Sequence, residues 1–183
     1  MEPTFKIFFP GKLVFGKGTI NELAEEIFSL SATKVLLITI EPLLSSLKDL
    51  SDALKARGLE LLVDTSINKE PTFDDFKSLM KRVAPFNADV VLGIGGGSVL
   101  DIAKLVAAQL ESDQSLEEIV GIGLLNGRKK KLICVPATSG TGSEASPNAI
   151  LVDNSDNQKK GIISPFLVPD VVYVDPLLSI CVP

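Results

Sequence analysis

The chain has 183 residues, of which 45% are hydrophobic and 22% are charged, with a net charge of −5 and no histidine. This composition excludes whole-chain disorder, collagen and coiled coil, and the acidic balance argues against a general nucleic-acid binder. The missing histidine excludes a Ser-His-Asp triad, a histidine base and a histidine metal ligand. The mean hydropathy of +0.32 indicates a sheet buried on both faces or an apolar face that meets a partner.

The first elements are expected to be a hairpin and a helix. Residues 5–9 and 12–15 are two short apolar runs on either side of a Pro-Gly pair, a pattern typical of a hairpin. Thr19 and Glu22 fit a capping box, so a helix is expected to begin there.

The middle of the chain alternates apolar runs with amphipathic stretches. The runs predict strands at residues 35–40, 59–63, 89–94 and 131–135. The stretches predict helices that begin at Pro42, at Thr72 with its partner Asp75, and at Ser98. Near the C-terminus a second hairpin is expected over residues 148–152 and 159–163, and a last strand over residues 171–174.

Strands separated by helices imply parallel pairing with right-handed crossovers. The sequence therefore predicts one α/β domain over residues 1–183, a doubly wound and mostly parallel Rossmann-like sheet with helices on both faces, plus the N-terminal hairpin. Such sheets bind ligands outside the carboxyl ends of their strands, at the point where the strand order reverses.

A glycine turn follows the strand at residues 89–94. Gly95, Gly96 and Gly97 lie between this strand and the helix that begins at Ser98. Without Cβ atoms a phosphate can approach the backbone and φ can be positive, while the helix start offers free N–H groups. Ser98 with Asp101 also fits a capping pattern. We interpret the turn as a phosphate site; the alternative is a tight turn whose glycines only pack against a neighbour.

A hydroxyl-rich loop follows the strand at residues 131–135. It carries Thr138, Ser139, Thr141 and Ser143 and is expected at the same edge of the sheet as the glycine turn. Loops of this composition are usually solvated and polar, so its position beside the turn is the argument for a ligand site.

The charged residues give weaker signals. Lys159 and Lys160 fit a solvated edge strand, although one of them could reach a phosphate from the hairpin. The basic run at residues 128–131 is interpreted as a solvated segment before a strand. The acidic pairs at residues 74–75 and 117–118 do not share helix faces, so no metal site is expected. Cys134 and Cys181 are too far apart in sequence for a zinc motif.

The sequence Gly95-Gly96-Gly97-Ser98-x-x-Asp101-x-x-Lys104, followed by the segment at residues 135–144, resembles the iron-containing (group III) alcohol dehydrogenase family. Residues 15–18 and 170–176 also fit. The resemblance implies hydride transfer between an alcohol or aldehyde and NAD or NADP. It implies that Gly96, Gly97 and Ser98 hold the pyrophosphate, and that Asp101 lies near the nicotinamide.

The resemblance further assigns Thr138, Ser139, Thr141 and Ser143 to the cofactor cleft. It places Lys160 at the phosphate or ribose. Where many NAD-using members have an acidic residue, this chain has Ile40, with Glu41 next to it. A hydrogen bond to the ribose is therefore expected to be absent, or to come from Glu41.

The sequence departs from the family in its metal ligands. Family members carry one Asp and three His in a helical domain that has no counterpart in these 183 residues. The resemblance therefore implies iron only in a full-length member, no catalytic residue and no metal ligand in this chain, and no turnover by the chain alone. The expected partners are a dinucleotide, the missing helical domain and a second copy of the chain, but no nucleic acid.

No targeting segment and no run of about 18 uncharged apolar residues is found, so the expected location is cytoplasmic and no membrane partner is expected. The alternative function is a non-catalytic nucleotide-binding or interaction module that keeps the fold.

Overall fold

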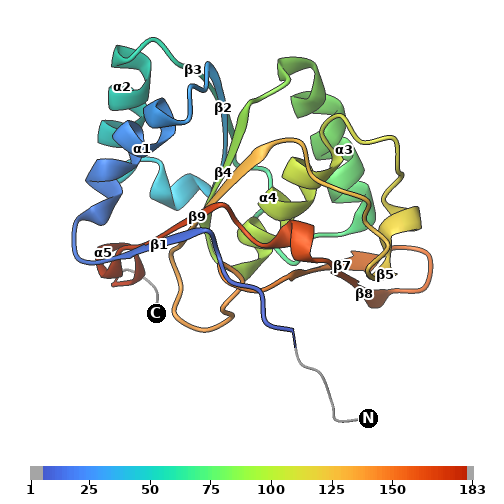
Figure 1. Ribbon diagram of the computed structural model, residues 1–183. Helices are drawn as coiled ribbons and strands as arrows, with labels where there is room; N and C mark the ends of the chain where they lie inside the picture. Colours follow the sequence, from blue (N-terminus) through green and yellow to red (C-terminus); the bar gives the residue numbers. More distant parts are fainter. Residues whose placement is uncertain (1–5, 181–183) are drawn as a thin grey trace.

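The computed structural model describes residues 6–180, so Phe5 and Cys181 lie outside the described residues. Its centre is a six-stranded sheet in the order β1-β9-β6-β4-β2-β3 (Figure 1). All neighbouring strands of this sheet run parallel. The strands are β1 (Lys12–Phe15), β2 (Lys34–Ile38), β3 (Glu60–Asp64), β4 (Val90–Gly95), β6 (Lys131–Pro136) and β9 (Val171–Val174). The predicted doubly wound parallel α/β fold is confirmed.

Helices cover both faces of the sheet, as Figure 1 shows. Alternate residues of a strand point to opposite faces, so Val91 of β4 packs with one apolar cluster while Val90 and Leu92 pack with the other. Helices α3 (Phe73–Val83) and α4 (Gly97–Gln109) belong to the first cluster; α1 (Leu23–Ser29) and α2 (Lys48–Ala56) belong to the second. Burial on both faces explains why these strands are continuous apolar runs.

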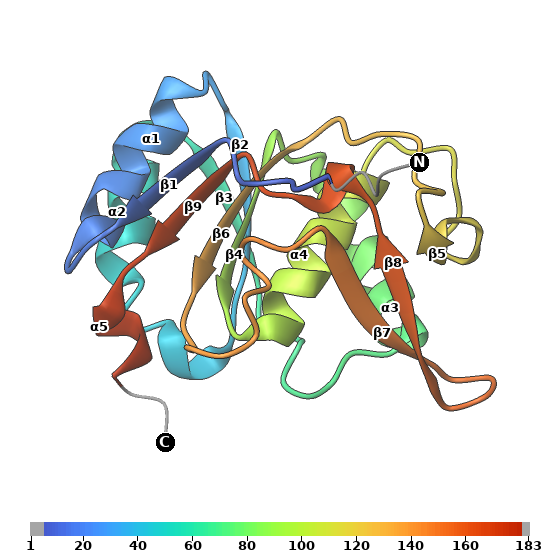
Figure 2. The same cartoon turned by 60° about the horizontal axis from the view of Figure 1, so that its bottom comes forward.

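A second, three-stranded sheet lies beside α3 and α4 (Figure 2). It contains the predicted C-terminal hairpin, β7 (Asn148–Asp153) paired antiparallel with β8 (Gln158–Ile163), and β5 (Gly121–Ile122), which runs parallel to β8. The remaining elements are α5 (Pro176–Ser179) and the short 3₁₀ helices η1 (Thr19–Glu22), η2 (Glu41–Leu43), η3 (Ala84–Phe86), η4 (Glu117–Ile119) and η5 (Pro165–Leu167).

The expected N-terminal hairpin is wrong for the described residues. Residues 6–10 form no strand, and β1 pairs with β9, far away in sequence. The Thr19–Glu22 capping box is also absent, because Thr19 donates its hydroxyl to Gly16 O (2.9 Å) and Gly18 precedes the 3₁₀ turn. Both expectations relied on residues that are close together in the sequence. The partner of β1 is instead β9, which is about 160 residues away along the chain.

The basic run before β6 is solvated only in part: Lys129 and Lys131 are exposed as expected, whereas Arg128 and Lys130 make structural contacts. Arg128 donates to Asp170 Oδ2 (2.6 Å) and to the carbonyls of Phe166 and Val168. Lys130 is buried and donates to Glu111 Oε1 (2.6 Å). Spacing along the chain could not reveal these carboxylate and carbonyl partners, since they come from other elements.

The strand order sets the position of the site. The chain goes from β2 outward to β3 and then crosses back to β4, so the order reverses between the neighbours β2 and β4. The segments that leave the carboxyl ends of these strands are residues 39–41 and the glycine turn. Ligands are expected in the crevice at such a reversal. Within the described residues no helix combines the length and hydropathy needed to cross a membrane.

Candidate functional site

The glycine turn connects the end of β4 to the start of α4. Gly96 precedes the helix, and its carbonyl accepts hydrogen bonds from the N–H groups of Val99 (3.0 Å) and Leu100 (3.1 Å). Among residues 6–180 no backbone or side-chain acceptor is paired with the N–H of Gly97 or Ser98. Two free donors at the positive end of a 13-residue helix form a cradle for an anion.

Close approach, not positive φ, explains the glycines of this turn. The freedom of glycine to adopt a positive φ is not used here, because none of the glycines from 93 to 97 has one. A Cβ on Gly95 would lie 2.8 Å from Val99 Cβ, so Gly95 serves the packing of β4 on α4. A Cβ on Gly97 would lie 2.8 Å from Thr141 Cγ2, so Gly97 lets the neighbouring loop approach the cradle.

The hydroxyl-rich loop lies against the glycine turn, at the sheet edge where both were expected. The ideal Cβ position of Gly96 is 3.4 Å from Thr138 Cγ2, and that of Gly97 is in contact with Thr141. In Figure 2 the segment between β6 and β7 passes beside the end of α4 at which the helix begins. Ser139 and Thr141 are exposed, whereas Ser143 is buried.

The loop separates two pockets. One, of about 220 Å³, opens beside the cradle and is lined by Glu70, Pro71, Gly97, Ser98, Asp101, Thr141, Ser143, Ser146, Asn148, Ile150 and Lys159. The other, of about 270 Å³, lies by the ends of β6 and β9 and is lined by Phe15, Pro136, Thr138, Ser139, Gly140, Glu144, Val174, Asp175, Pro176 and Ser179. The first pocket therefore contains five of the twelve residues that the sequence assigned to the cofactor, namely Gly97, Ser98, Asp101, Thr141 and Ser143.

Asp101 binds the loop and does not cap its own helix. The predicted Ser98–Asp101 capping pattern is wrong, since the helix has no side-chain cap. Instead Asp101 Oδ1 accepts a hydrogen bond from the Ser143 hydroxyl, and Oδ2 accepts one from the N–H of Ile150 (3.1 Å). Asp101 therefore connects α4 with both the hydroxyl-rich loop and β7.

Sequence reasoning missed Lys104 as a site residue. Its side chain is fully buried, and its Nζ donates to Ser143 Oγ (2.8 Å), Ser146 Oγ (3.1 Å) and Asn148 O (2.9 Å). Asp101 Oδ1 is 3.7 Å from the same nitrogen. Burial lowers the pKa of Lys104 from its usual 10.5, and Asp101 opposes that shift. The available signal was a lysine one turn after Asp101 within an otherwise apolar helix.

The two hairpin lysines point in different directions, because neighbours on a strand face opposite sides. Lys159 lines the pocket beside the cradle and forms an ion pair with Glu70 at its edge. Lys160 forms an ion pair with Asp156 on its own hairpin. The structure therefore brings Lys159, and not Lys160, next to Gly97 and Ser98.

Ile40 and Glu41 follow the end of β2, beside the strand that leads into the glycine turn. Ile40 is extended (φ −116°, ψ 150°) and packs partly buried against the apolar cluster of α3 and α4. Glu41 is the exposed first residue of η2. Thr39, the residue that follows β2, is fully buried and donates its hydroxyl to Ile94 O (2.8 Å). This hydrogen bond fixes the end of β2 against β4.

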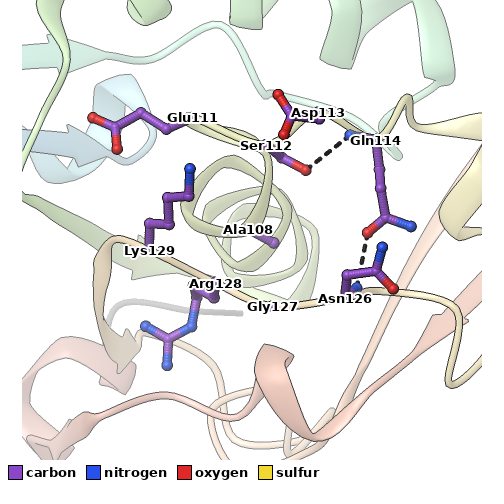
Figure 3. Close-up of a pocket in the computed structure, with 9 residues that line it drawn as sticks. All are labelled: Ala108, Glu111, Ser112, Asp113, Gln114, Asn126, Gly127, Arg128 and Lys129. Atoms are coloured by element: carbon purple, nitrogen blue, oxygen red, sulfur yellow. Dashed lines mark hydrogen bonds between the residues drawn. The ribbon is translucent and has the colours of Figure 1, made fainter.

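A further pocket, of about 290 Å³, lies at the opposite end of α4 (Figure 3). Its charged lining consists of Glu111, Asp113, Arg128 and Lys129, and Gln114 Oε1 accepts a hydrogen bond from the N–H of Asn126 (2.8 Å). The two carboxylates balance the two cations, and the carboxyl end of the helix adds a negative partial charge. It is therefore the less suitable of the two ends of α4 for a phosphate.

The iron that the resemblance implies does not fit the described residues. Within residues 6–180 no three His, Cys, Asp or Glu side chains lie close enough together to hold a metal ion. Cys134 is buried, and burial raises the pKa of its thiol to about 12, so it is neutral near pH 7.

Comparison with known proteins identifies the family. The model of the iron-containing alcohol dehydrogenases matches residues 10–176. Sulfoacetaldehyde reductase of Bilophila wadsworthia is 34% identical over 94% of this chain and 45% of its own length. Long-chain-alcohol dehydrogenase 1 of Geobacillus thermodenitrificans is 32% identical over 97% of this chain and 46% of its own length.

A solved structure gives the same result. The NADH-dependent butanol dehydrogenase A of Thermotoga maritima superposes with a TM-score of 0.88 at 28% identity, over 98% of this chain and 46% of that one. The chain thus spans slightly less than half the length of the relatives that it matches. With its parallel sheet, glycine turn and hydroxyl-rich loop, the chain belongs to the iron-containing alcohol dehydrogenase family, a family of oxidoreductases.

Proposed function

We propose that this chain binds a nicotinamide dinucleotide, with the pyrophosphate at the N-terminus of α4. The observation that carries the proposal is the pair of free N–H groups at Gly97 and Ser98, which face a hydroxyl-rich loop in contact with the turn. Backbone donors and a helix dipole favour a dianionic pyrophosphate over a neutral ligand. The membership of the family favours this function over a non-catalytic module.

Different residues of the site would bind different parts of the cofactor. Gly96, Gly97 and Ser98 would hold the pyrophosphate, and the hydroxyls of the loop would donate to its oxygens or to the ribose. Asp101, held by Ser143 and Ile150, would form part of the pocket wall. When bound, the nicotinamide would supply the hydride acceptor or donor.

Of the two hairpin lysines, we propose Lys159 as the phosphate partner. Its side chain is exposed at the pocket edge, where exchanging Glu70 for a phosphate would keep its charge paired. A role for Lys160 in binding requires that it leave Asp156.

We propose NAD as at least one of the cofactors used, because one solved relative is described as NADH-dependent. Ile40 has no acceptor for a ribose hydroxyl and no charge that would repel a 2′-phosphate. Weak discrimination between NAD and NADP is therefore expected in this chain.

The complete reaction is proposed at the level of the family. The curated relatives include a sulfoacetaldehyde reductase and a long-chain-alcohol dehydrogenase, so the substrate class is an alcohol or aldehyde. We propose that residues 1–183 act as the dinucleotide-binding domain, and that groups other than the described residues hold the metal. Apolar side chains at the carboxyl edge of the sheet, Phe15 (70% exposed) and Ile180 (72% exposed), support a partner surface there for a further domain or a second copy.

The test is a titration of the chain with NAD⁺ by calorimetry. Gly96→Val places two methyl groups at the cradle, where φ of −77° is accessible to valine, and is expected to abolish binding while the fold remains. Gly127→Val is the matched control, because a Cβ at Gly127 meets no atom within 4 Å and the residue lies at the far end of α4. Equal affinity of Gly96→Val and the parent would refute the assignment of the phosphate.

A further inference from the structure

Lys104 is a buried charge that the proposed contacts with the cofactor do not use. It is fully buried in α4, among residues that are otherwise apolar. Transferring an ammonium group from water into a protein interior is unfavourable unless its hydrogen bonds and its charge are satisfied. Here both are: three acceptors lie within 3.1 Å, and the Asp101 carboxylate lies 3.7 Å away.

The position of these partners indicates what the lysine does. Ser143, Ser146, Asn148 and Asp101 all line the pocket beside the glycine cradle, whereas Lys104 does not. The ammonium thus lies behind the wall of the pocket and contacts these four residues of its lining. Its three acceptors come from the end of the hydroxyl-rich loop and the first residue of β7, so a single side chain attaches both segments to α4.

The hydrogen bonds of Lys104 continue through Ser143 to Asp101, which lines the pocket. Lys104 donates to Ser143 Oγ, which leaves the hydroxyl proton of Ser143 to be donated to Asp101 Oδ1. Asp101 Oδ2 accepts from the N–H of Ile150 in β7. An apolar side chain of similar length, such as that of methionine, could not fix Ser143 in this orientation, since it would supply no donors.

We propose that Lys104 is a positioning residue for the dinucleotide pocket: its ammonium fixes the loop and the start of β7 on α4 and so keeps the pocket wall in its binding geometry without contacting the ligand. This inference rests on the proposed function for its ligand, but the attachment of the loop can be tested without a ligand.

The test compares Lys104→Met, Ser146→Ala and the control Lys55→Met, which changes an exposed lysine on α2. Hydrogen exchange of the amides of residues 139–150 reports the attachment of the loop, and NAD⁺ titration reports the pocket. Lys104→Met is expected to speed exchange in this segment selectively and to weaken binding roughly tenfold or more per folded molecule. Ser146→Ala removes one of the three acceptors and should give a smaller change in the same direction.

Amine rescue distinguishes positioning from simple filling of space. In Lys104→Ala the missing group is a propylammonium, so added n-propylamine is expected to restore slow exchange and affinity, whereas n-propanol of similar size is not. Equal rescue by both compounds, or unchanged exchange and affinity in Lys104→Met and Ser146→Ala, would overturn the proposal. If Lys104→Met does not fold, Ser146→Ala decides. If the parent chain does not bind NAD⁺, the proposed function fails, and the exchange rates still decide the role of Lys104.

Discussion

Gly97→Ala is expected to separate the binding role of the glycine turn from its role in folding. A Cβ at this position would lie 2.8 Å from Cγ2 and 3.0 Å from Oγ1 of Thr141. Atoms in contact prefer about 3.5–4.0 Å, so Thr141 has to move by about 1 Å. Because Thr141 lies on an exposed part of the loop, the displacement affects the loop and not the core.

The expected change in stability is small. Alanine is favoured over glycine within a helix by about 0.5–1 kcal/mol, and Gly97 has no positive φ that an alanine would strain. This gain offsets most of the cost of moving the loop, so the free energy of unfolding should change by less than about 1 kcal/mol. Gly95→Ala is the contrasting variant: its Cβ would lie 2.8 Å from Val99 in the core, where overpacking costs about 1–3 kcal/mol.

Binding is expected to respond more strongly than stability. The new methyl group stands before the free N–H groups and moves Thr141 away from the ligand, so affinity for NAD⁺ should fall by roughly tenfold or more, which is about 1.4 kcal/mol or more. Urea unfolding and calorimetric titration measure the two quantities. Gly97→Ala combined with Thr141→Ser removes the contact with Cγ2 but keeps the hydroxyl, and should bind better than Gly97→Ala alone. Parent-like affinity in Gly97→Ala, or no improvement in the double variant, would refute this reasoning.

Three further outcomes are expected. Ile40→Asp should shift the ratio of affinities towards NAD over NADP by roughly tenfold, measured by paired titrations; an unchanged ratio, with Glu41→Ala altering it instead, would assign the ribose to Glu41. Burial raises the pKa of Asp170, but hydrogen bonds from Arg128 and the N–H of Leu132 outweigh it and hold the pKa below 3.8. Asp170→Asn should therefore lose its full amount of stability above about pH 4, and this loss should shrink as the pH falls through the folded-state pKa. Urea unfolding across that range measures the loss, and a loss that does not vary with pH would contradict the prediction. The purified 183-residue chain should reduce no aldehyde with added iron or zinc, because it has no histidine and no metal-ligand cluster in residues 6–180. Metal-dependent reduction of an aldehyde by this chain would contradict the prediction.

Much of the fold could be predicted because its signals are local and repeated. The continuous apolar runs identified the buried strands, and Thr72 with Asp75 forms the expected reciprocal cap of α3. The pairing of β1 with β9 could not be predicted, since an edge strand finds its partner through the whole sheet. The basic run was misread in part for a related reason: Asp170, the partner of Arg128, is 42 residues away.

The candidate site was predictable in part for the same reason. Both the glycine turn and the hydroxyl-rich loop follow strands that were predicted to be parallel, which placed them at the same edge of the sheet, and the contact between Gly97 and Thr141 agrees with this expectation. The sequence could not show which lysine of the hairpin lines the pocket beside the cradle, because that depends on the strand register that places Lys159 at the pocket edge. Lys104 was missed because its acceptors are a loop serine pair and a backbone carbonyl, which no spacing pattern reveals.

The central claim is that a dinucleotide pyrophosphate binds at the N-terminus of α4. Backbone amide resonances of the ¹⁵N-labelled chain, followed during titration with NAD⁺, test it most directly. The account predicts that the largest shifts fall on Gly96, Gly97 and Ser98, with smaller ones over residues 138–143. Largest shifts over residues 126–129, at the opposite end of α4, or no shift at the glycine turn at saturating NAD⁺, would contradict it.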